Sequence, residues 1–204
     1  MIEFERCESL YWVFTHRCND RCPHCYNDSG PHGETLALDE CLAIVENLPR
    51  QTDRLILSGG EPLMELEKLL AIAGAARDKY GGATQLMLQT NGDRLTAPVL
   101  DRLLAHGISR IDVASMDRHH GGAGRRREEL EELFRSRGLS GDAIDPLVSQ
   151  DDYVQPDTPS YGLWGSTEDL WLGGNWPRGR AFRTGRWTRD GDHNFCAILS
   201  GGKG

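Results

Sequence analysis

The alternation of strand-like and helix-like segments constrains the fold of this chain more than any other feature of its sequence. Four short runs are apolar or β-branched, as strands are, and they cover residues 10–15, 55–58, 85–89 and 110–115. Each run is followed by a segment whose apolar residues recur at helical spacing, and these segments cover residues 36–48, 65–77, 97–106 and 130–137. Four strand–helix units in a row predict an α/β fold with a parallel sheet and right-handed crossovers.

Candidate ligand-binding residues follow each predicted strand. In sheets of parallel strands, ligands bind at the carboxyl ends of the strands. These segments are Cys18–Cys25 after the first strand, Gly59–Pro62 after the second, Gln89–Asn91 after the third and Ser115–Asp117 after the fourth. The sequence therefore predicts one site to which all four segments contribute.

Length, composition and charge limit the class of protein. The chain has 204 residues, of which 38% are hydrophobic, enough for one sizeable core and too few for two comfortable domains. It has 31 acidic and 23 basic residues, a net charge of −8, whereas nucleic-acid-binding proteins are usually basic. No apolar run approaches the roughly 18 residues that span a bilayer, and the N-terminal residues lack the basic and apolar regions of a signal peptide. We therefore expect a soluble cytoplasmic protein with no nucleic-acid or membrane partner.

Three of the six cysteines lie within eight residues, in the spacing Cys18-x3-Cys22-x2-Cys25. In a reducing compartment, clustered cysteines are typical of metal ligands. A structural zinc site needs four nitrogen or sulfur ligands, and His24 is poorly placed to be the fourth because neighbouring positions rarely reach one metal together. Three thiolates suit three corners of a cubane iron–sulfur cluster and leave one iron open for chemistry. A zinc knuckle remains the alternative.

The cysteine spacing and a second motif together resemble the radical SAM superfamily. The second motif is Ser58-Gly59-Gly60-Glu61-Pro62, directly after the second predicted strand. The resemblance implies a partial (β/α)6 TIM-type barrel with a poorly defined C-terminal segment. It implies that Cys18, Cys22 and Cys25 hold a [4Fe–4S] cluster, whose open iron chelates the amino and carboxylate groups of S-adenosylmethionine (SAM). It also implies that His24 places its ring near the adenine of SAM.

The resemblance implies a reaction as well. An electron donor of flavodoxin or ferredoxin type reduces the cluster, SAM is cleaved, and the resulting 5′-deoxyadenosyl radical abstracts a hydrogen atom from the substrate. The cofactors carry this chemistry, while the protein binds and orients the cofactors and the substrate and excludes water from the site. No catalytic residue is expected beyond the cluster and SAM.

Residues after the second strand are candidates for SAM binding. Two glycines allow a backbone to approach a ligand closely. By the resemblance, the segment that contains Gly59 and Gly60 receives the ammonium group of SAM, with a backbone carbonyl and Glu61 as acceptors. The alternative is a plain Gly-Gly turn in front of a helix.

Residues after the third and fourth strands are further candidates by the same resemblance. Gln89 and Asn91 end the third strand, and Ser115 and Asp117 are expected near the ribose or carboxylate of SAM. The alternatives are a simple Asn-Gly turn and a helix cap at Asp117.

The chain changes character after residue 137. The resemblance assigns residues 1–137 to a radical SAM core, and residues 138–204 to completion of the barrel and the start of a SPASM- or twitch-like extension. This assignment rests on the run Pro177-x-Gly179-Arg180-Ala181, followed by Cys196. Further cysteines bind auxiliary clusters in such extensions. We therefore expect the encoded protein to continue past Gly204 and to hold an auxiliary cluster in that longer form, with an ordinary buried thiol as the alternative for Cys196.

Several other polar residues have more than one interpretation. Five arginines lie between Arg178 and Arg189, and one of them is a candidate for holding the carboxylate of SAM or of an acidic substrate, because arginine binds carboxylates bidentately. Surface solubility is the alternative. His119 and His120 are expected in an exposed loop, and Cys41 in the core.

Three functions remain open. Peptide or protein maturation is the first choice, because of the resemblance around Gly179 and Cys196. Biosynthesis of a cofactor or tetrapyrrole precursor is the second, since related branches share the ending Cys22-x-His24-Cys25-Tyr26. A non-catalytic metal-binding module is the third, and metal content and SAM turnover distinguish it from the other two.

Overall fold

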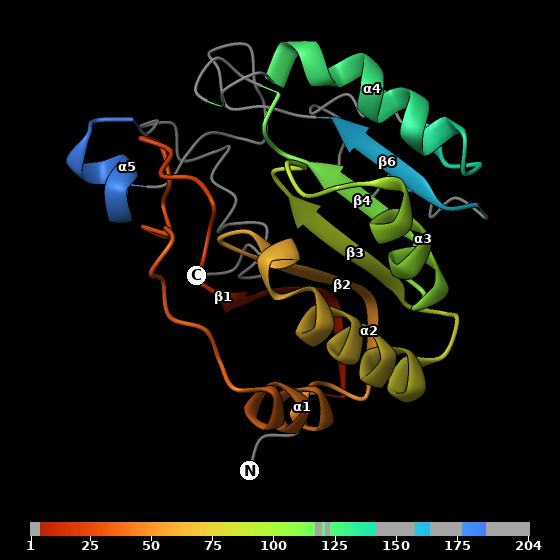
Figure 1. Ribbon diagram of the computed structural model, residues 1–204. Helices are drawn as coiled ribbons and strands as arrows, with labels where there is room; N and C mark the ends of the chain where they lie inside the picture. Colours follow the sequence, from red (N-terminus) through yellow and green to blue (C-terminus); the bar gives the residue numbers. More distant parts are fainter. Residues whose placement is uncertain (1–4, 117–119, 121–122, 142–157, 164–176, 187–204) are drawn as a thin grey trace.

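The computed structural model describes residues 5–116, 120, 123–141, 158–163 and 177–186 (Figure 1). Asp117, His119 and Cys196 lie outside these residues. Among the described residues, no helix has the length and apolar character that crossing a membrane requires.

Within the described residues, six parallel strands form one sheet in the order β1-β2-β3-β4-β6-β5. Their bounds are Arg6–Thr15 (β1), Gln51–Gly59 (β2), Gln85–Thr90 (β3), Arg110–Val113 (β4), Ser140–Gly141 (β5) and Ser160–Leu163 (β6). All neighbouring pairs are parallel, which confirms the parallel α/β fold and agrees with a partial TIM-type barrel. The sequence did not predict β6, because four residues that include Ser160 and Gly162 give almost no periodic signal.

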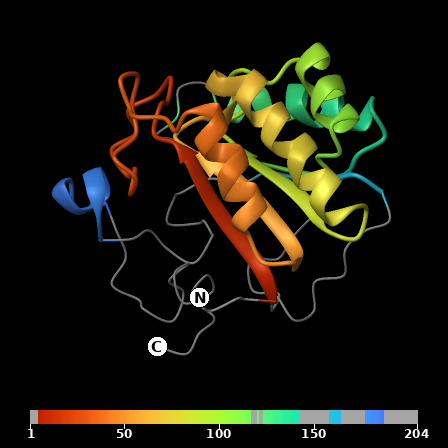
Figure 2. The ribbon, with the colours of Figure 1, turned by 90° about the horizontal axis from the view of Figure 1, so that it is seen from below.

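Helices follow the first four strands and cover one face of the sheet (Figures 1 and 2). Their bounds are Leu38–Asn47 (α1), Leu66–Tyr80 (α2), Ala97–Ala105 (α3) and Ala123–Arg135 (α4), with a 3-10 turn, η1, at Pro62–Glu65 and a short helix, α5, at Gly179–Arg183. The loops that connect these strands to the helices therefore begin at the carboxyl ends of the strands.

The core lies between the sheet and the helices. Leu55, Leu57, Leu86 and Leu88 of the central strands are fully buried. Helices α2, α3 and α4 cover them with apolar side chains, namely Leu69, Ile72, Ala73, Leu100, Leu103 and Phe134. Apolar runs of this kind are expected of parallel strands.

The first two strands begin earlier than the sequence predicted. Strand β1 begins at Arg6 and β2 at Gln51, and these two residues are partners in the ladder. Arg6 also forms an exposed ion pair with Asp53, with 3.0 Å between Nη2 and Oδ2. Apolar periodicity does not detect such polar strand ends, because backbone pairing alone defines them.

Strands β5 and β6 extend the same sheet beyond residue 137. The division into a core of residues 1–137 and a second part of residues 138–204 stays a prediction.

Candidate functional site

The loop between β1 and α1 carries the three cysteines, and we call residues 16–37 the cysteine loop. Thr15 and Thr35 form an antiparallel bridge at its base. The backbone N–H of Cys18 donates to the carbonyl of Gly30 at 2.9 Å. The loop therefore folds back on itself at the carboxyl end of β1, the edge where the sequence predicted a site.

All three thiols belong to the cysteine loop, and Cys25 interacts electrostatically with both of the others. Cys18 is buried, while Cys22 and Cys25 are half-buried. Burial raises the pKa of the Cys18 thiol to about 11, and the nearby Cys25 adds to the rise. Burial also raises the pKa of Cys22, and its neighbours Asp20, Cys18 and Cys25 raise it further. Metal binding would therefore have to displace protons from at least two of these thiols.

The backbone of the cysteine loop donates to two of the sulfurs. The N–H of Asp20 points to Sγ of Cys18 at 3.4 Å, and the N–H of Ser29 points to Sγ of Cys25 at 3.3 Å. Such bonds stabilise negative charge on sulfur and tune cluster potentials. Three sulfur donors in one loop, two of which already accept N–H···S bonds, fit a cubane cluster.

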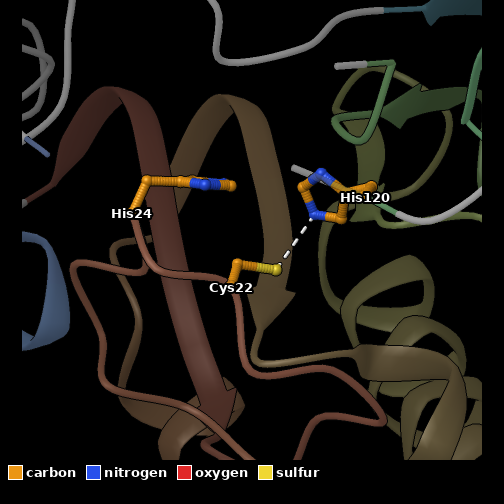
Figure 3. A group of neighbouring side chains, drawn as sticks. All are labelled: Cys22, His24 and His120. Atoms are coloured by element: carbon orange, nitrogen blue, oxygen red, sulfur yellow. Dashed lines mark hydrogen bonds between the residues drawn. The ribbon is translucent and has the colours of Figure 1, made fainter. Parts of the chain in front are cut away.

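Cys22, His24 and His120 form a second group of metal-ligating side chains (Figure 3). Their ligand atoms all lie within 4.8 Å of one another. Sγ of Cys22 lies 3.1 Å from Nε2 of His120, and the two imidazole rings meet edge to face with centroids 5.2 Å apart. One sequence expectation was wrong here, because His120 is half-buried against Cys22 rather than exposed.

A hydrogen-bond network joins the first three strands near the cysteine loop. The hydroxyl of Tyr11 on β1 donates to Oε1 of Gln89 at 2.5 Å and lies 2.6 Å from Oγ of Ser58. Ser58 itself donates to Gln89 at 3.1 Å, and the hydroxyl of Tyr26 lies 3.0 Å from that of Tyr11. The structure thus brings together the predicted residues Ser58 and Gln89.

Sequence reasoning missed Tyr11 and Tyr26. Burial raises the pKa of both phenols, so both hydroxyls remain protonated donors at neutral pH. Alternation along β1 could have identified Tyr11, because it lies two residues from Val13 and Ser9 on the same side of the strand.

The two glycines at the end of β2 lie against the backbone at the end of β1 and the start of the cysteine loop. A Cβ on Gly60 would lie 2.3 Å from the carbonyl oxygen of Arg17, and a Cβ on Gly59 would lie 2.5 Å from that of Thr15. The close approach is made by the chain's own backbone, and the N–H of Gly60 donates to Thr15 at 2.7 Å.

Glu61 is fully buried and accepts three hydrogen bonds from the protein. Its donors are the N–H of Leu63 at 2.9 Å, Oγ1 of Thr90 at 2.6 Å and the N–H of Asn91 at 2.7 Å. Burial raises the pKa of the carboxyl group, although these three bonds oppose the rise. Glu61 therefore links the ends of β2 and β3. Its expected contact with the ammonium group of SAM stays a prediction.

The ends of β3 and β4 are also linked. Oγ of Ser115 donates to the carbonyl of Asn91 at 2.5 Å, and Nδ2 of Asn91 donates to Oδ1 of Asn19 in the cysteine loop at 2.9 Å. Pro62 is buried at the start of η1. The predicted residues Asn91 and Ser115 thus lie at the same sheet edge as the cysteine loop, whereas Asp117 is outside the described residues. Cys41 is fully buried in the core, as expected.

Several curated proteins are similar to this chain over about half its length. AdoMet-dependent heme synthase of Methanosarcina barkeri is 34% identical over 109 residues, which are 52% of this chain and 30% of that protein. GTP 3′,8-cyclase of Synechococcus sp. (strain CC9902) is 38% identical over 49% of this chain and 29% of that protein. Pre-heme d1 synthase of Dinoroseobacter shibae is 35% identical over 52% and 26%. The chain spans less than a third of the length of each of these relatives.

Among solved structures, the crystal structure of BtrN in complex with AdoMet and 2-DOIA is 19% identical. The alignment covers 83% of this chain and 59% of the BtrN chain, with a TM-score of 0.44. A likeness at this level carries no argument about the site.

The family model of the Radical SAM superfamily matches residues 12–135, more than half of the chain. This range extends from β1 to the end of α4 and includes the cysteine loop. Proteins of this superfamily use a [4Fe–4S] cluster and SAM. From the match and from the geometry of the loop, the chain belongs to the radical SAM superfamily.

Proposed function

We propose that this chain is the core of a radical SAM enzyme that acts on a cofactor precursor, with a tetrapyrrole as the first candidate. The observation that carries the proposal is the cysteine loop, which places three thiols at the carboxyl edge of the parallel sheet. When bound, the cluster would supply the electron that cleaves SAM and generates the 5′-deoxyadenosyl radical for hydrogen abstraction.

The chain's own residues would bind and orient the cluster and SAM. Cys18, Cys22 and Cys25 would hold the cluster. The segment Gly59–Pro62 would bind SAM, and the other proposed contacts are His24, Ser58, Gln89, Asn91, Ser115 and Asp117. Support comes from the hydrogen bonds that join the ends of β2, β3 and β4 to one another and to the cysteine loop. A site linked in this way would keep cluster and SAM in a fixed relation.

The substrate class rests on the relatives. Two of the three described above are named for tetrapyrroles and one for a GTP cyclisation. These names favour the cofactor interpretation over peptide maturation, which was the first choice from sequence. We also propose a reductant of flavodoxin or ferredoxin type as partner and the cytoplasm as location, because three reduced thiols suit a reducing compartment.

Anaerobic reconstitution tests the proposal. Iron and sulfide should each approach about four per chain, and the reduced protein should release 5′-deoxyadenosine from SAM. A tetrapyrrole precursor of heme should raise this release above the substrate-free rate. Stimulation by a mixed peptide library alone would contradict the substrate class, and no 5′-deoxyadenosine under any condition would contradict the reaction.

A metal-binding module without radical chemistry is the second candidate. It is favoured by Cys22, His24 and His120, since two imidazoles and one thiolate are zinc ligands. Stoichiometric zinc without sulfide, together with no turnover of SAM, would support this candidate instead.

A further inference from the structure

Helix α5 packs against the cysteine loop (Figures 1 and 2), although Arg180 and Cys22, which are in contact, lie 158 positions apart in sequence. The guanidinium of Arg180 donates to three acceptors of the loop. These are the carbonyl of Cys22 at 2.7 Å, the carbonyl of Ser29 at 2.8 Å and Oδ1 of Asp28 at 3.0 Å. Its side chain is only 13% exposed, so solvent competes little for these bonds.

The carbonyls of two cysteines each have one partner inside the loop and one on α5. The carbonyl of Cys22 accepts from the N–H of Cys25 at 3.1 Å and from Arg180. The carbonyl of Cys25 accepts from the N–H of Asp28 at 3.4 Å and from the N–H of Ala181 at 3.1 Å. The bonds from α5 therefore reinforce the two consecutive turns that determine where the Cys25 side chain lies relative to Cys22.

The fit between α5 and the loop is close. Gly179 has a φ of +56°, and a Cβ on it would lie 2.4 Å from the carbonyl oxygen of Tyr26. Thr184 just after the helix donates to the carbonyl of Pro23 at 2.6 Å. Backbone contact at this distance leaves no room for a side chain at residue 179.

Arg183 makes a weaker contact with the same loop. It donates to Oδ2 of Asp28 at 2.7 Å, but its side chain is 59% exposed. Arg183 thus has the same charge as Arg180 on the same helix and touches neither cysteine carbonyl, which makes it a matched control.

We propose that Arg180 is a positioning residue, which through α5 holds the two turns of the cysteine loop between Cys22 and Ser29 in place and thereby fixes the position of Cys25 relative to Cys22. The earlier alternatives for these arginines, a bond to the carboxylate of SAM or surface solubility, do not describe Arg180, because its three donor atoms are directed at the loop. The effect of Arg180 on a cluster rests on the proposed function, whereas its effect on the loop does not.

The first experiment measures amide hydrogen exchange of residues 22–29 in the metal-free protein. Arg180→Ala should accelerate exchange about tenfold or more, the factor expected when hydrogen bonds from a charged donor are lost. Gly179→Ala should do the same without any change of charge. Arg183→Ala, and Arg102→Ala on the distant helix α3, should change it less than about twofold, because exposed ion pairs contribute little. Wild-type exchange in Arg180→Ala would overturn the proposal.

The second experiment measures the reconstituted cluster. Arg180→Ala should lose iron to a chelator about tenfold faster than the wild type, and Arg180→Lys should lie between the two, since an ammonium cannot reproduce the planar fork. The midpoint potential should fall in Arg180→Ala and fall less in Arg183→Ala, because a nearby cation stabilises the reduced cluster. Equal shifts of the midpoint potential in the two variants would mean that Arg180 acts only through its charge, and would contradict the proposal. If the wild type forms no cluster, the proposed function fails, and the exchange experiment still tests the contact.

Discussion

The carboxylate of Glu61 accepts a hydrogen bond from the backbone N–H of Asn91 at 2.7 Å, so a buried acid after β2 determines where the chain turns after β3. The other carboxylate oxygen accepts from Thr90 and Leu63. This single side chain thereby holds two of the four segments that the sequence predicted to share a site.

Replacing Glu61 should destabilise the metal-free protein. Glu61→Ala leaves three buried donors without an acceptor and should lower the free energy of unfolding by about 3 kcal/mol or more, and Glu61→Gln by about 1–3 kcal/mol, because its amide NH2 cannot accept from Asn91. Urea unfolding measures both losses. Glu129→Gln, on the exposed side of α4, is the control and should stay within about 0.5 kcal/mol of the wild type.

The same carboxylate predicts a pH dependence. Burial raises the pKa of Glu61 in the folded state, so the folded protein retains this proton more tightly than the unfolded chain. Its contribution to stability is complete below the unfolded pKa and is lost as pH rises through the raised folded pKa. The stability of the wild type relative to Glu61→Gln should therefore fall over this interval, and a constant difference would refute the assignment.

Gly60→Ala should disturb the protein before any ligand is present. The new Cβ would lie 2.3 Å from the carbonyl oxygen of Arg17, so either β2 or the cysteine loop must move. We expect a lower free energy of unfolding without metal, and lower cluster content as well as weaker SAM binding. Gly74→Ala in α2 is the matched control, because nothing lies within 4 Å of its Cβ, and it should stabilise the helix by about 0.5–1 kcal/mol. Normal cluster content with loss of SAM binding alone would contradict this expectation and would indicate that the new side chain enters the space of SAM.

Changing any of Cys18, Cys22 or Cys25 to Ala should abolish the cluster, since each supplies one thiolate. Cys41→Ala should leave iron and sulfide near wild-type values, because Cys41 lies on the buried face of α1, within the core. Colorimetric iron and sulfide assays after reconstitution decide the matter. A variant of the triplet that still holds about four iron and four sulfide would remove that cysteine from the ligand set.

His120→Ala should distinguish the two metal sites. Zinc binding by the metal-free protein should weaken by about tenfold or more, because one of three ligands is lost. Iron and sulfide after reconstitution should be retained, since the cubane uses only thiolates. Competition with a chromophoric chelator measures the zinc affinity. Cys18→Ala should do the reverse, with zinc binding retained and the iron and sulfide of the cluster lost. If His120→Ala binds zinc like the wild type, the three side chains of Figure 3 are not a metal site.

Local pattern was enough to predict the parallel sheet and the edge that carries the site. The apolar runs that became β2 and β3 are short and continuous, and each is followed by a helical stripe. The cysteine spacing is equally local, since three thiols within eight residues share a loop whatever surrounds it. Signals of this kind depend on residues a few positions apart, which a sequence displays directly.

The contacts that hold the site together could not be predicted in this way. Arg180 meets Cys22 across 158 positions, His120 meets it across 98, and Glu61 meets Asn91 across 30. Gly60 looks like a ligand-binding glycine in sequence, yet the backbone of Arg17 fills the space beside it. Which residues meet across such long separations in sequence depends on how β1, the cysteine loop and α5 pack against one another. No local periodicity encodes that packing. The sequence by itself therefore determined the first four strand–helix units, their order and the cysteine loop, while only the tertiary structure decided which side chains support that loop.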